Sequence, residues 1–257
     1  MGVSLGAARV IARAVGGGGV IVVGVETSTP QTSVAIGTER EILAHVAAAG
    51  KARQEVVTPA LAQLLRWTGI ELSQIGGVSV GVGPGLFTGL RVGIETAKTL
   101  AQVLRVPIIG LGSIDVLAYG ARFTHRTIAA VIDGRRGEVF FALYRSVPGG
   151  VVRQSEPAVA TPGHLVAELE AVPEEVLAVG NGAILYHDEI AKLGTRVEFA
   201  SPMLSHPSAE AVVELAVPRF LREDFSRPFD IVPLYLRKSD AEITLDKRVG
   251  GAPTRDR

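Results

Sequence analysis

Residues 81–91 read GVGPGLFTGLR and lie between an apolar run typical of a buried strand and a long helical pattern. The N–H groups of a glycine-rich strand-to-helix turn often bind phosphate, because they face the same point as the positive end of the helix. Pro84 and Gly85 also suit a tight corner that only redirects the chain. The stretch is therefore either a nucleotide site or a shaped surface for a protein partner.

Two known phosphate-binding motifs do not fit this turn. A P-loop has the pattern Gly-x-x-x-x-Gly-Lys-Ser/Thr, in which the lysine reaches the phosphates, but Leu90 and Arg91 follow Gly89. A dinucleotide-binding fingerprint needs a third glycine where Thr88 stands. The sequence therefore favours a corner that orients the following helix.

The composition excludes several classes of site. The chain has 257 residues, with 26 Lys and Arg against 26 Asp and Glu, so it shows no basic excess of the kind typical of nucleic-acid-binding domains. Because there is no cysteine, disulfides and thiolate metal sites are excluded, and a cytoplasmic location is expected. No stretch reaches the roughly 18 uncharged apolar residues of a membrane span, so no membrane association is expected.

The hydrophobic pattern predicts two α/β lobes of similar organisation. Residues 20–111 form the first lobe, which begins with three strands at hairpin spacing, and residues 112–240 form the second. Residues 1–19, which end in four glycines, are expected to be a flexible extension, and residues 241–257 a loose tail. The predicted strands are 20–25, 32–37, 41–46, 78–82, 107–111, 127–133, 138–144 and 176–179, and the predicted helices are 53–67, 88–105, 114–120, 161–170, 183–193 and 208–221.

The predicted helix 88–105 has apolar residues on two faces, whereas an ordinary surface helix needs only one. Its second apolar stripe contains Gly89, Gly93, Thr96, Leu100 and Val103. This stripe either lies under the second lobe or meets another chain, because glycines four residues apart let a partner helix approach closely. Periodicity alone leaves both interpretations open.

The sequence offers little support for metal or protease chemistry. The five histidines are scattered, and no two stand four residues apart on one helix face. There is no cysteine that could act as a nucleophile. Ser113 is better explained as the N-cap of the helix that follows it.

Four segments together resemble the bacterial TsaB (YeaZ) family. They are the stretches VETST at 25–29, GPGLFTGLRVG at 83–93, AK at 97–98 and IDGRRGEV at 132–139. The resemblance implies the two-lobed α/β fold of the actin-like and sugar-kinase-like (ASKHA) ATPase superfamily, with ribonuclease H-like lobes. It also implies a role in forming threonylcarbamoyladenosine beside the tRNA anticodon, as a non-catalytic scaffold and activator of a TsaD-like enzyme. A TsaE-like ATPase would join a larger complex, tRNA would be touched only indirectly, and the chain alone would form a homodimer.

In this family the two subunits join through two helices of the first lobe, which correspond to 53–67 and 88–105. We therefore expect the Gly89 and Gly93 stripe to face the partner, and Gly93→Arg to abolish association while the monomer still folds. The expected partner-binding residues are Val57, Ala60, Leu64, Trp67, Gly85, Phe87, Gly89, Gly93, Thr96, Leu100 and Val103.

The alternative is a small nucleotide-binding kinase or ATPase of the same fold. Its nucleotide site would contain Glu26, Thr27, Ser28, Asp133 and Arg135. Glu26 departs from the aspartate that the family usually has, and no glycine stands between residues 26 and 31. The site is expected to be degenerate, with no metal and no cofactor.

Overall fold

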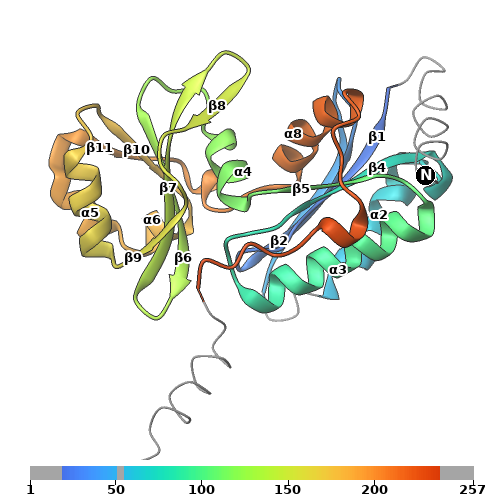
Figure 1. Cartoon of the computed structure of the whole chain (residues 1–257), viewed down its shortest axis with the longest axis horizontal. Coiled ribbons are helices and arrows are strands. Elements are labelled where there is room, and N and C mark those ends of the chain that lie inside the picture. The colour runs from blue at the N-terminus through green and yellow to red at the C-terminus, as the bar shows by residue number, and fades with distance from the viewer. Residues whose placement is uncertain (1–18, 51–54, 238–257) are drawn as a thin grey trace, which may run out of the picture.

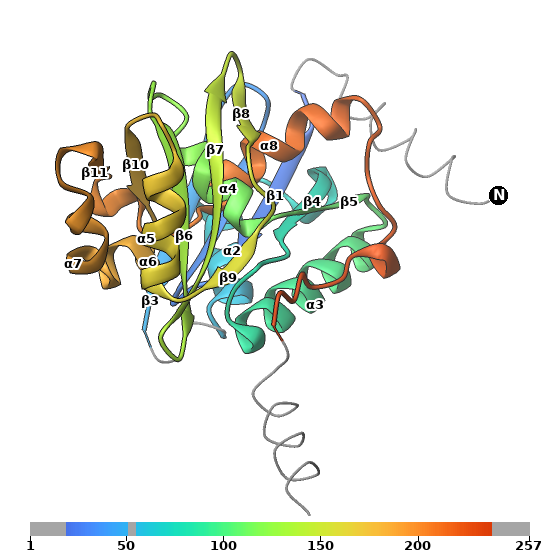
Figure 2. The same ribbon diagram turned by 60° about the vertical axis from the view of Figure 1, so that its left-hand side comes forward.

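The computed structural model describes residues 19–50 and 55–237, which form two α/β lobes side by side (Figure 1). The predicted extension up to residue 18, the predicted tail from 241 and the predicted helix start at 53 lie outside the described residues. Figure 2 shows the same two lobes from a second direction, with the strand order of the second sheet in view.

The first lobe contains a sheet with the strand order β3-β2-β1-β4-β5. Strands β1, β2 and β3 pair antiparallel, as predicted, whereas β4 runs parallel to β1 and β5 parallel to β4. The strands are β1 (Ile21–Glu26), β2 (Gln31–Gly37), β3 (Ile42–Ala49), β4 (Ile75–Gly81) and β5 (Ile108–Leu111).

Helices cover both faces of this sheet. Helices α2 (Val57–Thr68) and α3 (Phe87–Leu104) lie on one face, and α8 (Ala209–Leu221) lies on the other (Figure 1). Helix α2 begins at Val57, so Pro59 falls in the first turn, where a missing N–H costs no helical hydrogen bond. The 3-10 turn η2 (Leu72–Gln74) leads from α2 back into the sheet.

The second lobe contains a sheet with the order β11-β10-β6-β7-β8, in which β9 also pairs with β7. Its strands are β6 (Thr127–Arg135), β7 (Glu138–Val147), β8 (Gly150–Arg153), β9 (Ala158–Ala160), β10 (Val176–Val179) and β11 (Val197–Phe199). Its helical segments are α4 (Ser113–Gly120), α5 (Pro162–Ala171), α6 (Asn181–Leu185), α7 (His187–Ile190), η3 (Ala191–Arg196) and η4 (Pro202–Leu204). The single helix predicted over 183–193 is therefore broken into α6, α7 and η3.

The predicted boundary, which assigns residues 112–240 to the second lobe, is wrong at its C-terminal end. Ala209 and Val213 of α8 pack in one cluster with Val22 of β1. The chain then crosses back over the first lobe through η5 (Pro228–Asp230), and the Leu234 N–H donates to the carbonyl of Val82 at 2.7 Å. These contacts join segments far apart in the sequence, so no local pattern indicates them.

Close packing between the start of α3 and the end of β1 explains the glycines of the opening stretch. A Cβ on Gly85 would overlap the backbone of Ser28, and a Cβ on Gly89 would overlap the carbonyl of Thr27. A Cβ on Gly93 would overlap the side chain of Thr27, whose Oγ1 donates to the Gly89 carbonyl at 2.8 Å. The glycines therefore make room for residues of the same chain.

The expectation that Gly89 and Gly93 leave α3 bare for a partner helix is wrong. Both residues are buried inside the first lobe. Thr27 packs directly against them, so no space is left there for a partner helix. An arginine at position 93 would have no room, so Gly93→Arg would disturb folding and could not test the partner interface alone.

We expect Gly93→Ala to lower the free energy of unfolding by up to about 2 kcal/mol. The overlap with Thr27 costs about 1–3 kcal/mol, offset by about 1 kcal/mol of better helix propensity. The matched control is Gly163→Ala in α5, where a Cβ meets nothing within 4 Å. Denaturant unfolding measures the change in the free energy of unfolding that each substitution causes. Equal changes for Gly93→Ala and Gly163→Ala would contradict the close contact between Gly93 and Thr27.

Candidate functional site

The side chain of Glu26 occupies a closed corner at the end of β1. Its carboxyl is fully buried and lies over Gly81 of β4, where a Cβ would overlap it. Glu26 Oε1 accepts the Ser28 N–H at 2.7 Å. Glu26 Oε2 and Ser28 Oγ are both buried without a hydrogen-bond partner in the described part of the chain.

Burial raises the pKa of Glu26, because the charged form loses its hydration. The polar groups of Ser28 and Ser113 lower it only in part. A magnesium-nucleotide site needs an ionised, accessible carboxylate. A closed carboxyl with a raised pKa does not fit that role.

Ser113 connects the glycine-rich turn to the second lobe through hydrogen bonds with Gly83, and it does not cap a helix. The N-cap of α4 is Gly112, which makes no side-chain cap hydrogen bond, so the predicted capping role of Ser113 is wrong. Ser113 Oγ instead accepts the Gly83 N–H at 3.1 Å, and the Ser113 N–H donates to the Gly83 carbonyl at 2.7 Å. This pair of bonds fixes the turn between β4 and α3.

Asp133 shapes a hairpin in the second lobe. Its Oδ1 accepts the Arg135 N–H at 2.8 Å, and its Oδ2 lies 3.3 Å from Arg135 Nη1. This holds Arg135 in the left-handed conformation at φ 65°, while Asn181 Oδ1 accepts the Asp133 N–H at 3.2 Å. The predicted nucleotide-site residues thus form two groups, Glu26–Ser28 at the end of β1 and Asp133 with Arg135 at the end of β6.

Residues 19–50 and 55–237 hold no group of three or more His, Cys, Asp or Glu side chains placed to bind one ion. Nor does this part of the chain contain a helix long and apolar enough to cross a membrane.

The outer side of α2 and α3 forms a second candidate region. Trp67 of α2 is 64% exposed and Val103 of α3 is 75% exposed, which is unusual for large apolar side chains. The predicted partner residues Gly85, Phe87, Thr96 and Leu100 are half-buried.

Three other predicted partner residues lie on the inner side of α2. Val57, Ala60 and Leu64 are buried in the core between α2 and the sheet. The expectation that these three residues reach a partner is wrong, because the apolar face of α2 is already covered by its own lobe.

The C-terminal segment adds residues to this region that sequence reasoning missed. The ring of Tyr235 stacks on Phe87 with centroids 5.0 Å apart, and the Arg91 guanidinium lies 4.1 Å from the Phe87 centroid. Phe229 and Val232, 82% and 66% exposed, belong to the same segment. Arg91 and Tyr235 are 144 positions apart, so only the fold brings them together.

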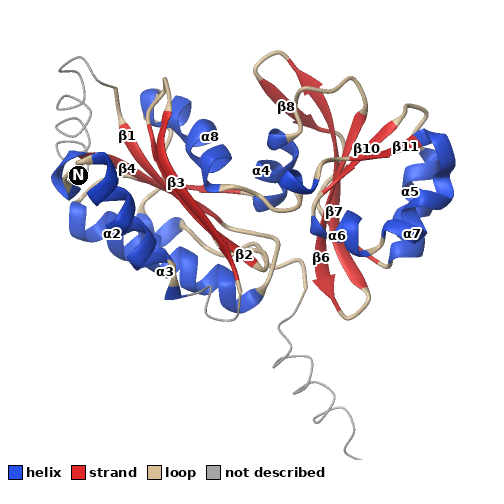
Figure 3. Ribbon diagram, turned by 180° about the vertical axis from the view of Figure 1, so that it is seen from behind, coloured by secondary structure: helices blue, strands red, loops and turns tan. Residues whose placement is uncertain are grey.

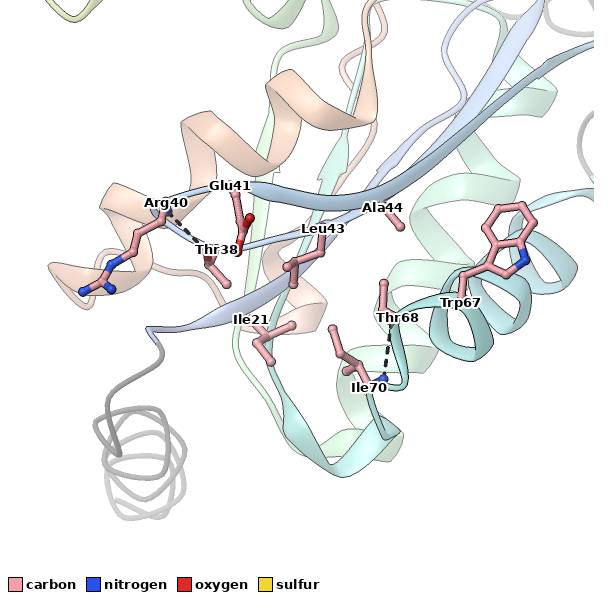
Figure 4. A pocket seen from close by; sticks show the side chains of 9 residues that line it. All are labelled: Ile21, Thr38, Arg40, Glu41, Leu43, Ala44, Trp67, Thr68 and Ile70. Carbon is pink, nitrogen blue, oxygen red and sulfur yellow. Dashed lines mark hydrogen bonds between the residues drawn. The ribbon is translucent and has the colours of Figure 1, made fainter.

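A hollow of about 460 Å³ lies next to Trp67, between the end of α2 and the edge of the sheet (Figure 4). Leu43 and Ala44 of β3 line it together with Ile21 and Ile70. Arg40 and Glu41 stand at its rim beside these apolar side chains. The exposed indole therefore borders a recess lined by both apolar and polar side chains.

Comparison with known proteins identifies the family. The model of the family "TsaD: tRNA N6-adenosine threonylcarbamoyltransferase" matches residues 42–245. The chain belongs to this family, in its TsaB (YeaZ) branch. It is 29% identical to the tRNA threonylcarbamoyladenosine biosynthesis protein TsaB of Escherichia coli, over 86% of this chain and 96% of that protein. It is 28% identical to TsaB of Bacillus subtilis, over 86% and 96% of the two chains.

A solved structure supports the same assignment. YeaZ from Pseudomonas aeruginosa superposes with a TM-score of 0.73 at 25% identity, covering 84% of this chain and all of that one. The predicted family and the predicted two-lobed α/β fold are thereby confirmed. The TsaB family acts in tRNA threonylcarbamoyladenosine biosynthesis.

We expect Glu26→Gln to change the pH dependence of stability. Because the folded-state pKa of Glu26 is raised, the folded chain binds more protons than the unfolded chain, and stability falls as pH rises above about 4.5. Glutamine cannot ionise, so the variant should gain stability relative to the wild type with rising pH.

Melting temperatures measured from pH 4.5 to 8, a range set by the ordinary carboxyl pKa of about 4.3, test this expectation. The control is Glu174→Gln, which removes an exposed carboxylate. A difference between Glu26→Gln and the wild type that stays constant with pH would show that Glu26 is ionised in the folded protein.

Proposed function

We propose that this chain is a non-catalytic subunit that binds a TsaD-like enzyme and activates it for threonylcarbamoyladenosine formation beside the tRNA anticodon. The observation that carries the proposal is the exposure of two large apolar side chains on the first-lobe helices, Trp67 of α2 and Val103 of α3. Exposed apolar patches on soluble domains mark interaction surfaces, and tryptophan is enriched among the residues that dominate binding energy.

The closed Glu26 corner supports the non-catalytic part of the proposal. Catalysis in this fold class would need accessible groups between the lobes, whereas Glu26 is fully buried and Asp133 is occupied by the hairpin turn. The wider assembly we propose includes a TsaE-like ATPase, and tRNA contacts this chain only indirectly.

Val103→Glu and Trp67→Glu should each weaken binding of a TsaD-like partner by at least about tenfold, because burying an unpaired carboxylate at an interface is costly. Both side chains are exposed, so the variants should fold. The control is Leu185→Glu on α6 of the second lobe, where the leucine is 58% exposed.

Co-elution and calorimetric titration with the partner, alongside circular dichroism, measure these effects. Normal binding by both helix variants would place the interface elsewhere. Loss of binding in Leu185→Glu alone would show that the partner interface lies on the second lobe.

The kinase or ATPase alternative makes a separate prediction. A site that bound magnesium ATP would raise the melting temperature by mass action at ligand concentrations well above the dissociation constant. We expect no shift with millimolar ATP and magnesium, by differential scanning fluorimetry. A rise of several degrees that Glu26→Gln abolished would support the nucleotide-binding alternative.

A further inference from the structure

Residues 226–237 form a strap that returns over the first lobe and then reaches the second. The beginning of the strap is anchored in the first lobe, where the Ser226 N–H donates to the carbonyl of Ile108 at 3.0 Å. Ile231 is buried in the core that α2 and α3 share with the sheet. Figure 1 shows the strap running along α3 and ending between the two lobes.

Three consecutive residues at the end of the strap contact the two lobes in turn. Tyr235 stacks on Phe87 of α3, which belongs to the first lobe. Leu236 packs against a core cluster of the second lobe, and Arg237 forms an ion pair with Glu138 of β7. The strap therefore bridges the two lobes on the side of α3.

The lobes also meet on the opposite face of the first sheet, where α8 lies. Helix α4 of the second lobe packs on α8 around Val116 and Val212, and Arg122 Nη2 lies 3.0 Å from Glu214 Oε2. Figure 3 shows α4 and α8 facing each other between the two sheets. The chain crosses between the lobes here as well, from β5 into α4 and from η4 into α8. This contact can therefore serve as a hinge.

The contacts at the end of the strap are weaker than those at the hinge. Val116 and Val212 are buried, whereas Tyr235 is 41% exposed. Arg91, whose Nε donates to the Tyr235 hydroxyl at 3.3 Å, is exposed too. Partly exposed aromatic contacts and ion pairs each contribute little to stability. The end of the strap can therefore open locally while both lobes stay folded.

We propose that the strap is a releasable connection that holds the two lobes in one relative position. Release of Tyr235 from α3, or of Arg237 from β7, frees the second lobe to turn about the contact between α4 and α8. Such rigid-body movement requires a hinge and two bodies that keep their internal packing. Each lobe has its own hydrophobic clusters, so each can move as a unit.

Spin labels on two introduced cysteines measure the proposed movement, because the chain has no cysteine of its own. Ala62→Cys in α2 and Ala167→Cys in α5 place the labels at exposed positions of the first and the second lobe. Pulsed electron paramagnetic resonance on the labelled chain, diluted with unlabelled chain, gives the label-to-label distances within one molecule. With the strap unchanged, we expect a single narrow distance distribution.

Removal of both end contacts of the strap should add a second population at a different distance. The variant that removes them is Tyr235→Ala with Arg237→Ala. The conservative pair Tyr235→Phe with Arg237→Lys keeps the ring and the positive charge, so it should restore the single distribution. The matched control is Phe229→Ala on the same strap, where the ring is 82% exposed, and it should leave the distribution unchanged.

Two results would each overturn the proposal. An unchanged narrow distribution in the double alanine variant would show that the strap does not hold the lobes. An equal second population in Phe229→Ala would show that the movement does not depend on the contacts of Tyr235 and Arg237. Circular dichroism checks that each variant is folded. If the double variant loses secondary structure, the single variants Tyr235→Ala and Arg237→Ala decide by the same two criteria.

Discussion

The close approach of β4 and α3 to the end of β1 is the constraint on which the first lobe depends. Four glycines, each four positions after the last, face residues 26–28: Gly81, Gly85, Gly89 and Gly93. At each position a single added Cβ would overlap residues 26–28. Because α3 can lie this close, its apolar face packs on the sheet without a gap, and the corner around Glu26 is closed to solvent.

This packing determines which surfaces remain for function. It buries the carboxyl of Glu26 and raises its pKa, so the corner is unsuited to binding magnesium and phosphate. It also turns the glycine stripe of α3 inward, so a partner can reach only the outer side, where Trp67 and Val103 are exposed. The closed Glu26 corner and the position of the proposed partner surface thus have a common physical cause.

Much of this fold follows from local sequence, but the sites follow only in part. Alternating and continuous apolar runs predict β1, β2 and β3, and the helix predicted over 161–170 is found as α5, with Thr161 as its N-cap. The same reasoning assigned Gly93 to a partner, because a small residue on a helix shows only that something comes close. It does not show whether that neighbour belongs to the same chain. The return of α8 and Tyr235 to the first lobe depends on contacts more than 140 residues apart, as the Arg91–Tyr235 separation of 144 shows.

Hydrogen exchange of the chain, alone and bound to a TsaD-like enzyme, tests the central claim most directly. The claim is that the chain works through the outer side of its first-lobe helices, with the Glu26 corner closed. Binding should slow exchange in residues 64–74 and 96–105, and leave residues 26–29 and 133–136 unchanged. Slower exchange in residues 26–29 and 133–136, with the two helices unaffected, would contradict it.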